Sequence, residues 1–345
     1  MTGVLGWDIG GVNTKVARVV HGEVVDVQAR AFEIQRQPQA LRPLLVGLAR
    51  AVGAQSGDAH AVTMTAELSQ AFRTKRDGVR FVLDHVLAAF PDALVRVHTV
   101  DGRFIDAAAA REAPLAVAAA NWAATARLVG QSWPNAVLID VGSTTTDITP
   151  IVDGAIAARG RTDPERLREG ELVYTGALRT PAEAIASTVP LRGGPAGVAA
   201  EGFAVAGDVH LWRGQLAPSD YSIPTPDGRP ATREFAGERL ARVVCADRDM
   251  LDEDAISVIA DSLWAAQVDR IAGAIARIVR REAWAERGPA VVTGLGDFLA
   301  AEAARRAGLQ VTHLSERWGR AARHAPAAAI ALLLAVRLEK EMIER

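Results

Sequence analysis

One segment of the chain occurs twice, 132 residues apart, and this duplication constrains the fold more than any other feature. Each copy reads as an apolar strand that ends in aspartate, then a glycine turn, then a second strand. A residue-Gly pair follows and predicts a hairpin to a third strand. The positions that match at this offset are Asp8 with Asp140, Gly10 with Gly142, Thr14 with Thr146 and Gly22 with Gly154. The sequence therefore predicts a duplicated β-hairpin unit, one in each of two domains.

Helical patterns and short apolar strands alternate after the first copy, which predicts an α/β fold with helices covering a sheet. Trp133-Pro134-Asn135 marks the expected boundary, which gives domains 1–134 and 135–325, and a closing helix over 326–345 that can pack back on the first domain. The second half has a long loop over 218–230. We expect helices over 38–52, 69–89, 107–128, 254–286 and 327–344, and a further helix that begins near Asp297. We expect strands over 62–65, 94–97, 291–292 and 309–313.

Charge and cysteine content exclude several classes of protein. The chain has 39 Lys and Arg against 41 Asp and Glu over 345 residues, a net charge of −2, whereas a general nucleic-acid binder needs a clustered cationic excess. The single cysteine, Cys245, excludes an internal disulfide and fits a reducing compartment. No signal peptide is visible, and the apolar run 325–336 is shorter than the ~20 residues of a membrane span. We expect a cytoplasmic protein without a nucleic-acid or membrane partner, and oligomerisation is left open.

The first copy carries a candidate phosphate site. Glycines at a strand end let backbone amides approach an anion, while a threonine hydroxyl and a lysine ammonium add donors. Asp8 at the strand end can hold Mg²⁺ through water. The alternative is an ordinary turn with a surface lysine. The candidate residues are Asp8, Gly10, Gly11, Asn13, Thr14 and Lys15.

The second copy places four hydroxyl-bearing residues after a glycine, between Asp140 and Asp147, where the alternative is a threonine-rich hairpin. The repeat favours phosphate binding, since two such hairpins could grip one polyphosphate, with Asp8 and Asp140 as metal ligands. A third glycine turn follows near 293–296, where a helix start can take a phosphate or Asp297 can simply cap the helix. The candidate residues here are Gly142, Ser143, Thr144, Thr145, Thr293, Gly294 and Gly296.

These three motifs, in this order, resemble the acetate/sugar kinase, chaperone and actin superfamily. The resemblance implies two ribonuclease-H-like domains with a duplicated phosphate hairpin and an interdomain cleft. Segments 64–79, 117–125, 172–181 and 241–247 resemble more narrowly the hydantoinase/oxoprolinase-like family, in the subgroup linked to methanofuran and tetrahydromethanopterin one-carbon metabolism. That subgroup implies a synthase that joins an aminomethyl-furan-methyl diphosphate to the phenol oxygen of γ-glutamyl-tyramine and releases diphosphate.

Such a reaction needs a leaving-group site and a base. Mg²⁺, backbone amides and Lys15 would stabilise departing diphosphate, so ATP can bind but is not required. A phenol has a pKa near 10, so a base would help its oxygen attack. Glu67, just past the strand over 62–65, is the candidate base, and Lys75 serves the same region. The alternative for Glu67 is an acid at the start of the helix after Ser69.

Two further residues are candidates for the acceptor substrate. Arg179 can bind a carboxylate as a fork, and Asn121 beside Trp122 can form a substrate wall; a surface arginine and a core tryptophan are the alternatives. The seven histidines show no metal-ligand spacing. Two other functions stay open: an ATP-dependent kinase or amidohydrolase of the same fold, and a nucleotide-binding protein without catalysis.

Overall fold

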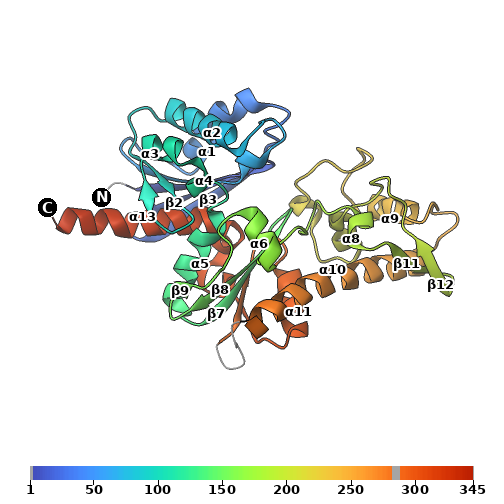
Figure 1. The fold of residues 1–345 in the computed structure, drawn as a ribbon. Coiled ribbons are helices and arrows are strands. Elements are labelled where there is room, and N and C mark those ends of the chain that lie inside the picture. The colour runs from blue at the N-terminus through green and yellow to red at the C-terminus, as the bar shows by residue number, and fades with distance from the viewer. Residues whose placement is uncertain (1–2, 282–287, 345) are drawn as a thin grey trace. The chain divides into compact units, whose positions relative to one another are not determined.

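The computed structural model describes residues 3–281 and 288–344, and the chain divides into two compact units (Figure 1). Unit 1 comprises Met1–Ala136, Thr149–Arg166 and Leu314–Arg345, and unit 2 comprises Val137–Ile148 and Leu167–His313. The segment 149–166 therefore lies with the first unit rather than with the expected second domain. A close contact explains this placement, because a Cβ on Gly130 would lie 2.7 Å from the carbonyl oxygen of Gly154.

The first sheet lies in unit 1 and has the strand order β3-β2-β1-β4-β5-β6. Strands β1, β2 and β3 form an antiparallel meander, while β4 and β5 run parallel to β1. The His21-Gly22 turn between β2 and β3 has positive φ at both residues, as the hairpin prediction requires. The strands are β1 (Val4–Ile9), β2 (Asn13–Val20), β3 (Glu23–Ala31), β4 (Ala59–Met64), β5 (Val95–His98) and β6 (Phe104–Ile105).

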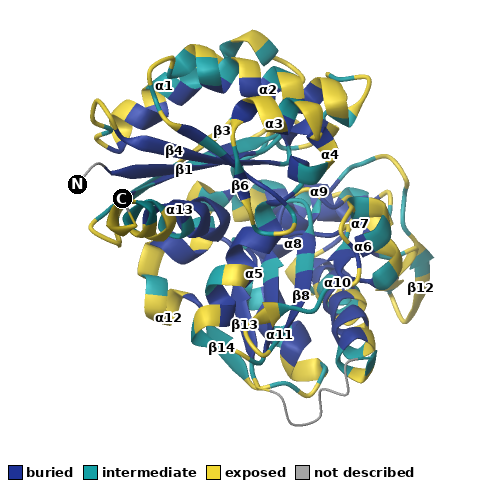
Figure 2. Cartoon of the chain, turned by 60° about the vertical axis from the view of Figure 1, so that its left-hand side comes forward, coloured by how far each residue is buried: buried dark blue, intermediate teal, exposed yellow. Residues whose placement is uncertain are grey.

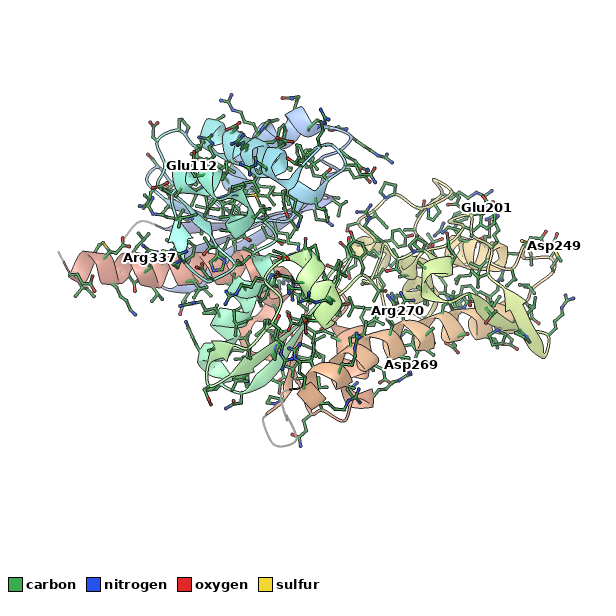
Figure 3. The ribbon with its side chains drawn as sticks, in the orientation of Figure 1. Glu112, Glu201, Asp249, Asp269, Arg270 and Arg337 are labelled. Carbon is green, nitrogen blue, oxygen red and sulfur yellow. The ribbon has the colours of Figure 1, made fainter. Side chains whose placement is uncertain are left out.

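Both faces of this sheet are buried at its central strands β1 and β4, whereas the edge strand β3 is largely exposed (Figure 2). Leu5, Trp7 and Ile9 of β1 pack in one apolar cluster with residues of α1 (Leu41–Ala51) and α2 (Lys75–Ala89). The alternate face packs on α13 (Ala325–Ile343), so closely that a Cβ on Gly6 would lie 2.0 Å from the carbonyl oxygen of Ala327. Alternation of side chains along a strand places the two sets on opposite faces. In addition, Arg337 of α13, labelled in Figure 3, donates to the carbonyl of Phe104.

The second sheet repeats the order of the first. Its path is β10-β8-β7-β13-β14, with β9 paired to β8, so the series β9-β8-β7-β13-β14 corresponds to β3-β2-β1-β4-β5. The turn at Asp153 and Gly154 has positive φ at both residues, like its counterpart. The duplication predicted from the sequence is therefore present in three dimensions. The strands are β7 (Ala136–Val141), β8 (Thr146–Val152), β9 (Ala155–Ile156), β10 (Leu172–Val173), β13 (Ala290–Thr293) and β14 (Val311–His313).

The remainder of unit 2 is mainly helical and has its own apolar core. The long helix α10 (Glu253–Arg281) contributes Ile256, Ile259 and Leu263 to that core at helical spacing. The expected end of this helix at Glu286 lies outside the described residues. The other elements of this part are α7 (Ala182–Ile185), β11 (Thr188–Leu191), β12 (Gly194–Gly197), α8 (Ala206–Trp212), a 3-10 turn (Pro218–Asp220), α9 (Arg233–Arg242) and α11 (Asp297–Arg306).

Two predicted helices of unit 1 were wrong in extent. The helix expected over 69–89 begins at Lys75, because Thr74 caps it by accepting a hydrogen bond from the Asp77 amide. The helix expected over 107–128 is broken before Pro114, since proline lacks the amide that a helix interior needs, and again at Ala119, which has positive φ. The pieces are α3 (Ala107–Glu112), α4 (Pro114–Val117) and α5 (Asn121–Ser132); the other short elements are α6 (Asp163–Glu169), α12 (Ser315–Trp318) and 3-10 turns at Pro38–Ala40, Ala66–Leu68 and Gly319–His324.

Within the described ranges one helical stretch, Ser315–Ile343, is long and apolar enough by length and composition to cross a membrane. It contains α13, and 56% of its most apolar window is buried inside the protein. The buried part packs on β1 and β2 of the first sheet. This packing is that of a core helix.

Candidate active site

The first hairpin forms the turn that the sequence predicted for an anion site. The Gly10 amide donates to the Asn13 carbonyl at 3.0 Å, and a Cβ on Gly10 would lie 2.7 Å from that same oxygen. Only glycine fits there without moving the backbone. A Cβ on Gly11 would meet no atom closer than 4.0 Å, so the outer side of this turn is open to a ligand.

Asp8 and Lys15 face each other across the first hairpin. They are paired residues of the antiparallel strands β1 and β2, and Lys15 Nζ lies 3.0 Å from Asp8 Oδ2. The second carboxylate oxygen, Oδ1, is buried and has no hydrogen-bond partner among the described residues. A buried carboxylate oxygen is costly to leave unsatisfied. This oxygen is therefore suited to a water molecule of a bound cation.

His324, just before α13, is near the same pair, which the sequence did not predict. Burial lowers the pKa of His324 to about 4, Lys15 lowers it further, and Asp8 opposes the change. The imidazole is therefore neutral at physiological pH. No spacing pattern connects a histidine near the end of the chain with a hairpin at its start, so only the fold reveals this neighbour.

Glu67 is a buried ionisable group of unit 1. It is 1% exposed, and neither carboxylate oxygen has a hydrogen-bond partner within the described residues. Burial raises the pKa of Glu67 from 4.5 to about 7; Lys75 and the backbone amides of Glu67 and Ala119 lower it, and Asp163 raises it. A carboxyl with a pKa near 7 is half ionised at physiological pH, which suits a general base.

Lys75 lies between two carboxylates. Its Nζ is 3.8 Å from Glu67 Oε1 and 2.5 Å from Asp163 Oδ2. Asp163, the first residue of α6, was missed by the sequence analysis because 88 positions separate it from Lys75 and no motif joins them. The alternative that Glu67 starts the helix after Ser69 is wrong, because that helix begins at Lys75 with Thr74 as its cap. Glu67 lies instead in the 3-10 turn Ala66–Leu68.

The topology explains why Glu67 and the first hairpin share one edge of the sheet. Strands β1 and β4 are parallel, with Asp8 opposite Thr63, so the turns after both strands emerge together. Met64 also bridges to Ala118, whose neighbour Ala119 has positive φ. That turn leads directly into α5 and brings half-buried Asn121 to the same edge.

Trp122, next to Asn121, is a core residue rather than a wall of a pocket. It is buried, and the guanidinium of Arg166 stacks 4.1 Å from the centre of its ring. Arg166 belongs to α6, the same helix as Asp163, and a Cβ on Gly160 would lie 2.5 Å from the Arg166 amide. These contacts fix α6 against α5.

The second hairpin repeats the backbone of the first. The Gly142 amide donates to the Thr145 carbonyl at 2.9 Å, the same bond as that of Gly10 at the offset of 132. Ser143, Thr144 and Thr145 are all half-buried. The segment that follows β10 supports this turn from behind, because the amides of residues 177, 178 and 179 donate to the carbonyls of residues 142 and 143. The turn is therefore held rigidly with its hydroxyls at the surface of unit 2.

The third motif meets the second hairpin. Strand β13 runs parallel to β7 with Thr293 opposite Asp140. Gly294 has φ of +96°, and a Cβ there would lie 2.5 Å from Asp140 Oδ1. The same Cβ would lie 2.4 Å from the Val141 carbonyl oxygen, so the backbone of β7 requires this glycine as much as the position of Asp140 does. The predicted helix start at Asp297 is confirmed, but the alternative role of Asp297 as the cap is wrong, since the N-cap is Gly296.

Arg179 is exposed, and its amide donates to the Ser143 carbonyl at 2.9 Å. Its side chain therefore leaves the backbone beside the second hairpin. Among residues 3–281 and 288–344 no group of three or more His, Cys, Asp or Glu side chains could hold a metal ion by protein ligands alone. A magnesium ion bound through one carboxylate, water and phosphate oxygens does not need such a group.

Two sheets, each with a glycine hairpin at the end of its central parallel strands, define an α/β protein of the actin-like fold. Solved structures agree with this fold. Acetone carboxylase in its nucleotide-free form has a TM-score of 0.54 at 12% identity, covering 96% of this chain and 70% of that one. The activator of 2-hydroxyisocaproyl-CoA dehydratase from Clostridium difficile, with bound ADPNP, has a TM-score of 0.50 at 12% identity, covering 100% and 98%. These likenesses confirm the predicted fold class.

The chain belongs to the hydantoinase/oxoprolinase family, whose model matches residues 58–337. A relative from Methanocaldococcus jannaschii is 34% identical over 339 residues, 98% of this chain and 99% of its own length. A second, from Methanococcus vannielii, is 34% identical over 190 residues, 54% of this chain and 84% of its own length. Both are named as synthases of a furan-2-yl-methanamine that carries a γ-glutamylaminoethyl-phenoxymethyl group. The family resemblance predicted from the sequence is confirmed.

Proposed function

We propose that the chain is the synthase that forms the ether bond of this furan product, in methanofuran biosynthesis. The acceptor is the phenol of γ-glutamyl-tyramine, and the donor is an aminomethyl-furan-methyl diphosphate. The names of the relatives support this reaction over the kinase and amidohydrolase alternatives. The observation that carries the proposal at the site is Glu67, a buried carboxyl with its pKa raised to about 7.

The chemistry forms one bond and breaks one. The phenol oxygen forms a bond to the exocyclic furan-methyl carbon, whose bond to the diphosphate oxygen breaks, and the electron pair leaves with diphosphate. The furan oxygen spreads the positive charge that develops on this carbon. The phenolic proton passes to Glu67, since a carboxylate with a pKa near 7 accepts it more readily than an ordinary one. The ammonium of Lys75 stabilises the developing phenolate.

Each glycine hairpin offers donors for phosphate oxygens in this proposal. The first offers backbone amides near Gly11 and the ammonium of Lys15, and the second offers the hydroxyls of residues 143–145. Asp8 fits a magnesium ion bound through water, because its Oδ1 is buried and unsatisfied, and Asp140 occupies the equivalent position in the second copy. The ion would offset the charge of the leaving diphosphate. Arg179 and Asn121 remain our candidates for the glutamyl end of the acceptor.

The proposal does not need ATP. The dehydratase activator was solved with bound ADPNP, and the fold that it shares with this chain includes proteins with different reactions. ATP turnover is therefore the property that separates the synthase from the alternative functions. We also propose that the enzyme acts in the cytoplasm, where the reducing environment suits the exposed Cys245.

The test is incubation of the purified protein with the furan diphosphate, glutamyl-tyramine and Mg²⁺, with the ether detected by mass spectrometry and released diphosphate measured in parallel. We expect equal amounts of ether and diphosphate without ATP. Glutamyl-phenethylamine, which lacks the phenolic hydroxyl, is the matched control and should give no ether. ATP hydrolysis stimulated by a small amide, without ether formation, would instead favour the amidohydrolase.

A further inference from the structure

Lys75 is held more tightly by Asp163 than by Glu67. The distance from its Nζ is 2.5 Å to Asp163 Oδ2 but 3.8 Å to Glu67 Oε1. The side chains of Lys75 and Asp163 are 23% and 17% exposed, whereas that of Glu67 is fully buried. The ammonium therefore stands beside the candidate base without forming a hydrogen bond to it.

We propose that Asp163 is a positioning residue, which holds the Lys75 ammonium 3.8 Å from Glu67 and prevents the two from closing to hydrogen-bond distance. This inference rests on the proposed ether synthesis, in which Glu67 accepts the phenolic proton. If Lys75 paired directly with Glu67, the carboxylate would be a weaker base and its oxygen would be occupied. With Asp163 as its partner, Lys75 can contact the phenol oxygen while Glu67 stays free.

The structure around Asp163 is built to keep it in place. Asp163 begins α6, and the helix start favours a negative charge. Arg166, one turn later, is buried against Trp122 of α5. These contacts hold the first turn of α6, and with it Asp163, in a fixed position.

The charges that face Glu67 come from two helices. Lys75 of α2 lowers its pKa, and Asp163 of α6 raises it; the nearby amides of residues 67 and 119 lower it. Replacing Asp163 by asparagine removes the charge that raises the pKa of Glu67 and frees Lys75 to approach it. Both effects lower the pKa of Glu67. Replacing Lys75 by methionine acts in the opposite direction.

The experiment compares the pH dependence of kcat in wild type, Asp163→Asn and Lys75→Met. In Asp163→Asn the acid limb should move down by about one pH unit or more, the size of shift that a neighbouring charge produces, and the plateau should fall because the base is weaker. In Lys75→Met the acid limb should move up. The control is Asp84→Asn, on the same helix as Lys75, which breaks an exposed ion pair between Asp84 and Arg111. It should leave the acid limb unchanged.

A direct titration separates this inference from the proposed reaction. The carboxyl of Glu67 can be followed by NMR in protein labelled with ¹³C at the glutamate side chain, and identified by its loss in Glu67→Gln. Opposite shifts in Asp163→Asn and Lys75→Met would support the positioning role even if no ether formed. An unchanged titration of Glu67 in a folded Asp163→Asn protein, or shifts of the same sign in both variants, would overturn it.

Discussion

As pH rises, the unfolding free energy of Glu67→Gln should increase relative to that of the wild-type protein. Burial raises the pKa of Glu67 from 4.5 to about 7, so the folded state holds this proton over a range where the unfolded state has lost it. The protonated carboxyl therefore makes its full contribution to the unfolding free energy below pH 4.5, and this contribution is lost as pH rises to about 7. At 1.36 kcal/mol per unit the full effect is about 3 kcal/mol, of which about 2.5 kcal/mol falls between pH 5 and 8.

The assay is chemical denaturation of wild type and Glu67→Gln at pH 5 and pH 8. The difference in unfolding free energy between the two proteins should change by about 2.5 kcal/mol in favour of glutamine on going to pH 8. This comparison cancels any constant cost of burying the amide. Glu112→Gln, at an exposed position labelled in Figure 3, is the matched control and should show no such change. The same difference at both pH values would mean that Glu67 ionises normally, and the reasoning from burial would be refuted.

Three other predictions concern activity. Asp8→Asn and Asp140→Asn should each lower turnover by ~10²-fold or more with the fold retained, because each removes a charge that orders the cation on the leaving diphosphate; full activity in both, measured as diphosphate release, would remove this role. Glu67→Gln should lower kcat by ~10²–10⁴-fold with little change in affinity for the diphosphate substrate. Phenols with electron-withdrawing groups should partly restore it, and a defect that no acceptor relieves would make Glu67 structural. Gly294→Ala should cost more than about 1 kcal/mol through its positive φ alone and displace Asp140, so a variant with normal unfolding and turnover would contradict the geometry.

The repeated hairpins could be predicted because their determinants are local. An aspartate at a strand end, a glycine whose Cβ has no space, and a residue-Gly turn with positive φ all act within a few residues, and the offset of 132 located both copies. The helix over 69–89 was predicted too long because apolar spacing continued upstream of its cap. Thr74 ends that pattern through a hydrogen bond to Asp77, which periodicity does not register.

The site was only partly predictable because its geometry depends on distant segments. Glu67 and Lys75 were chosen from one stretch of sequence, next to a strand end. Asp163 approaches Lys75, and His324 approaches the first hairpin, only because of how the whole chain folds. Neither residue stands in a recognisable motif. Burial of Glu67, which sets its pKa, is likewise a property of the packed unit and not of its neighbours in sequence.

The packing of α13 on the first sheet has a consequence for how the protein is made. Gly6 and Ala327 are in contact although more than 300 residues separate them. The ribosome therefore synthesises the first strands long before the helix that covers one of their faces. Until that helix is made, apolar residues on this face, such as Val4 and Val19, stay exposed. During this interval the nascent chain exposes apolar strands that can associate wrongly. We expect unit 2, which ends at His313, to fold earlier than the sheet that precedes it, so that synthesis proceeds from the first residue while folding is completed by one of the last helices.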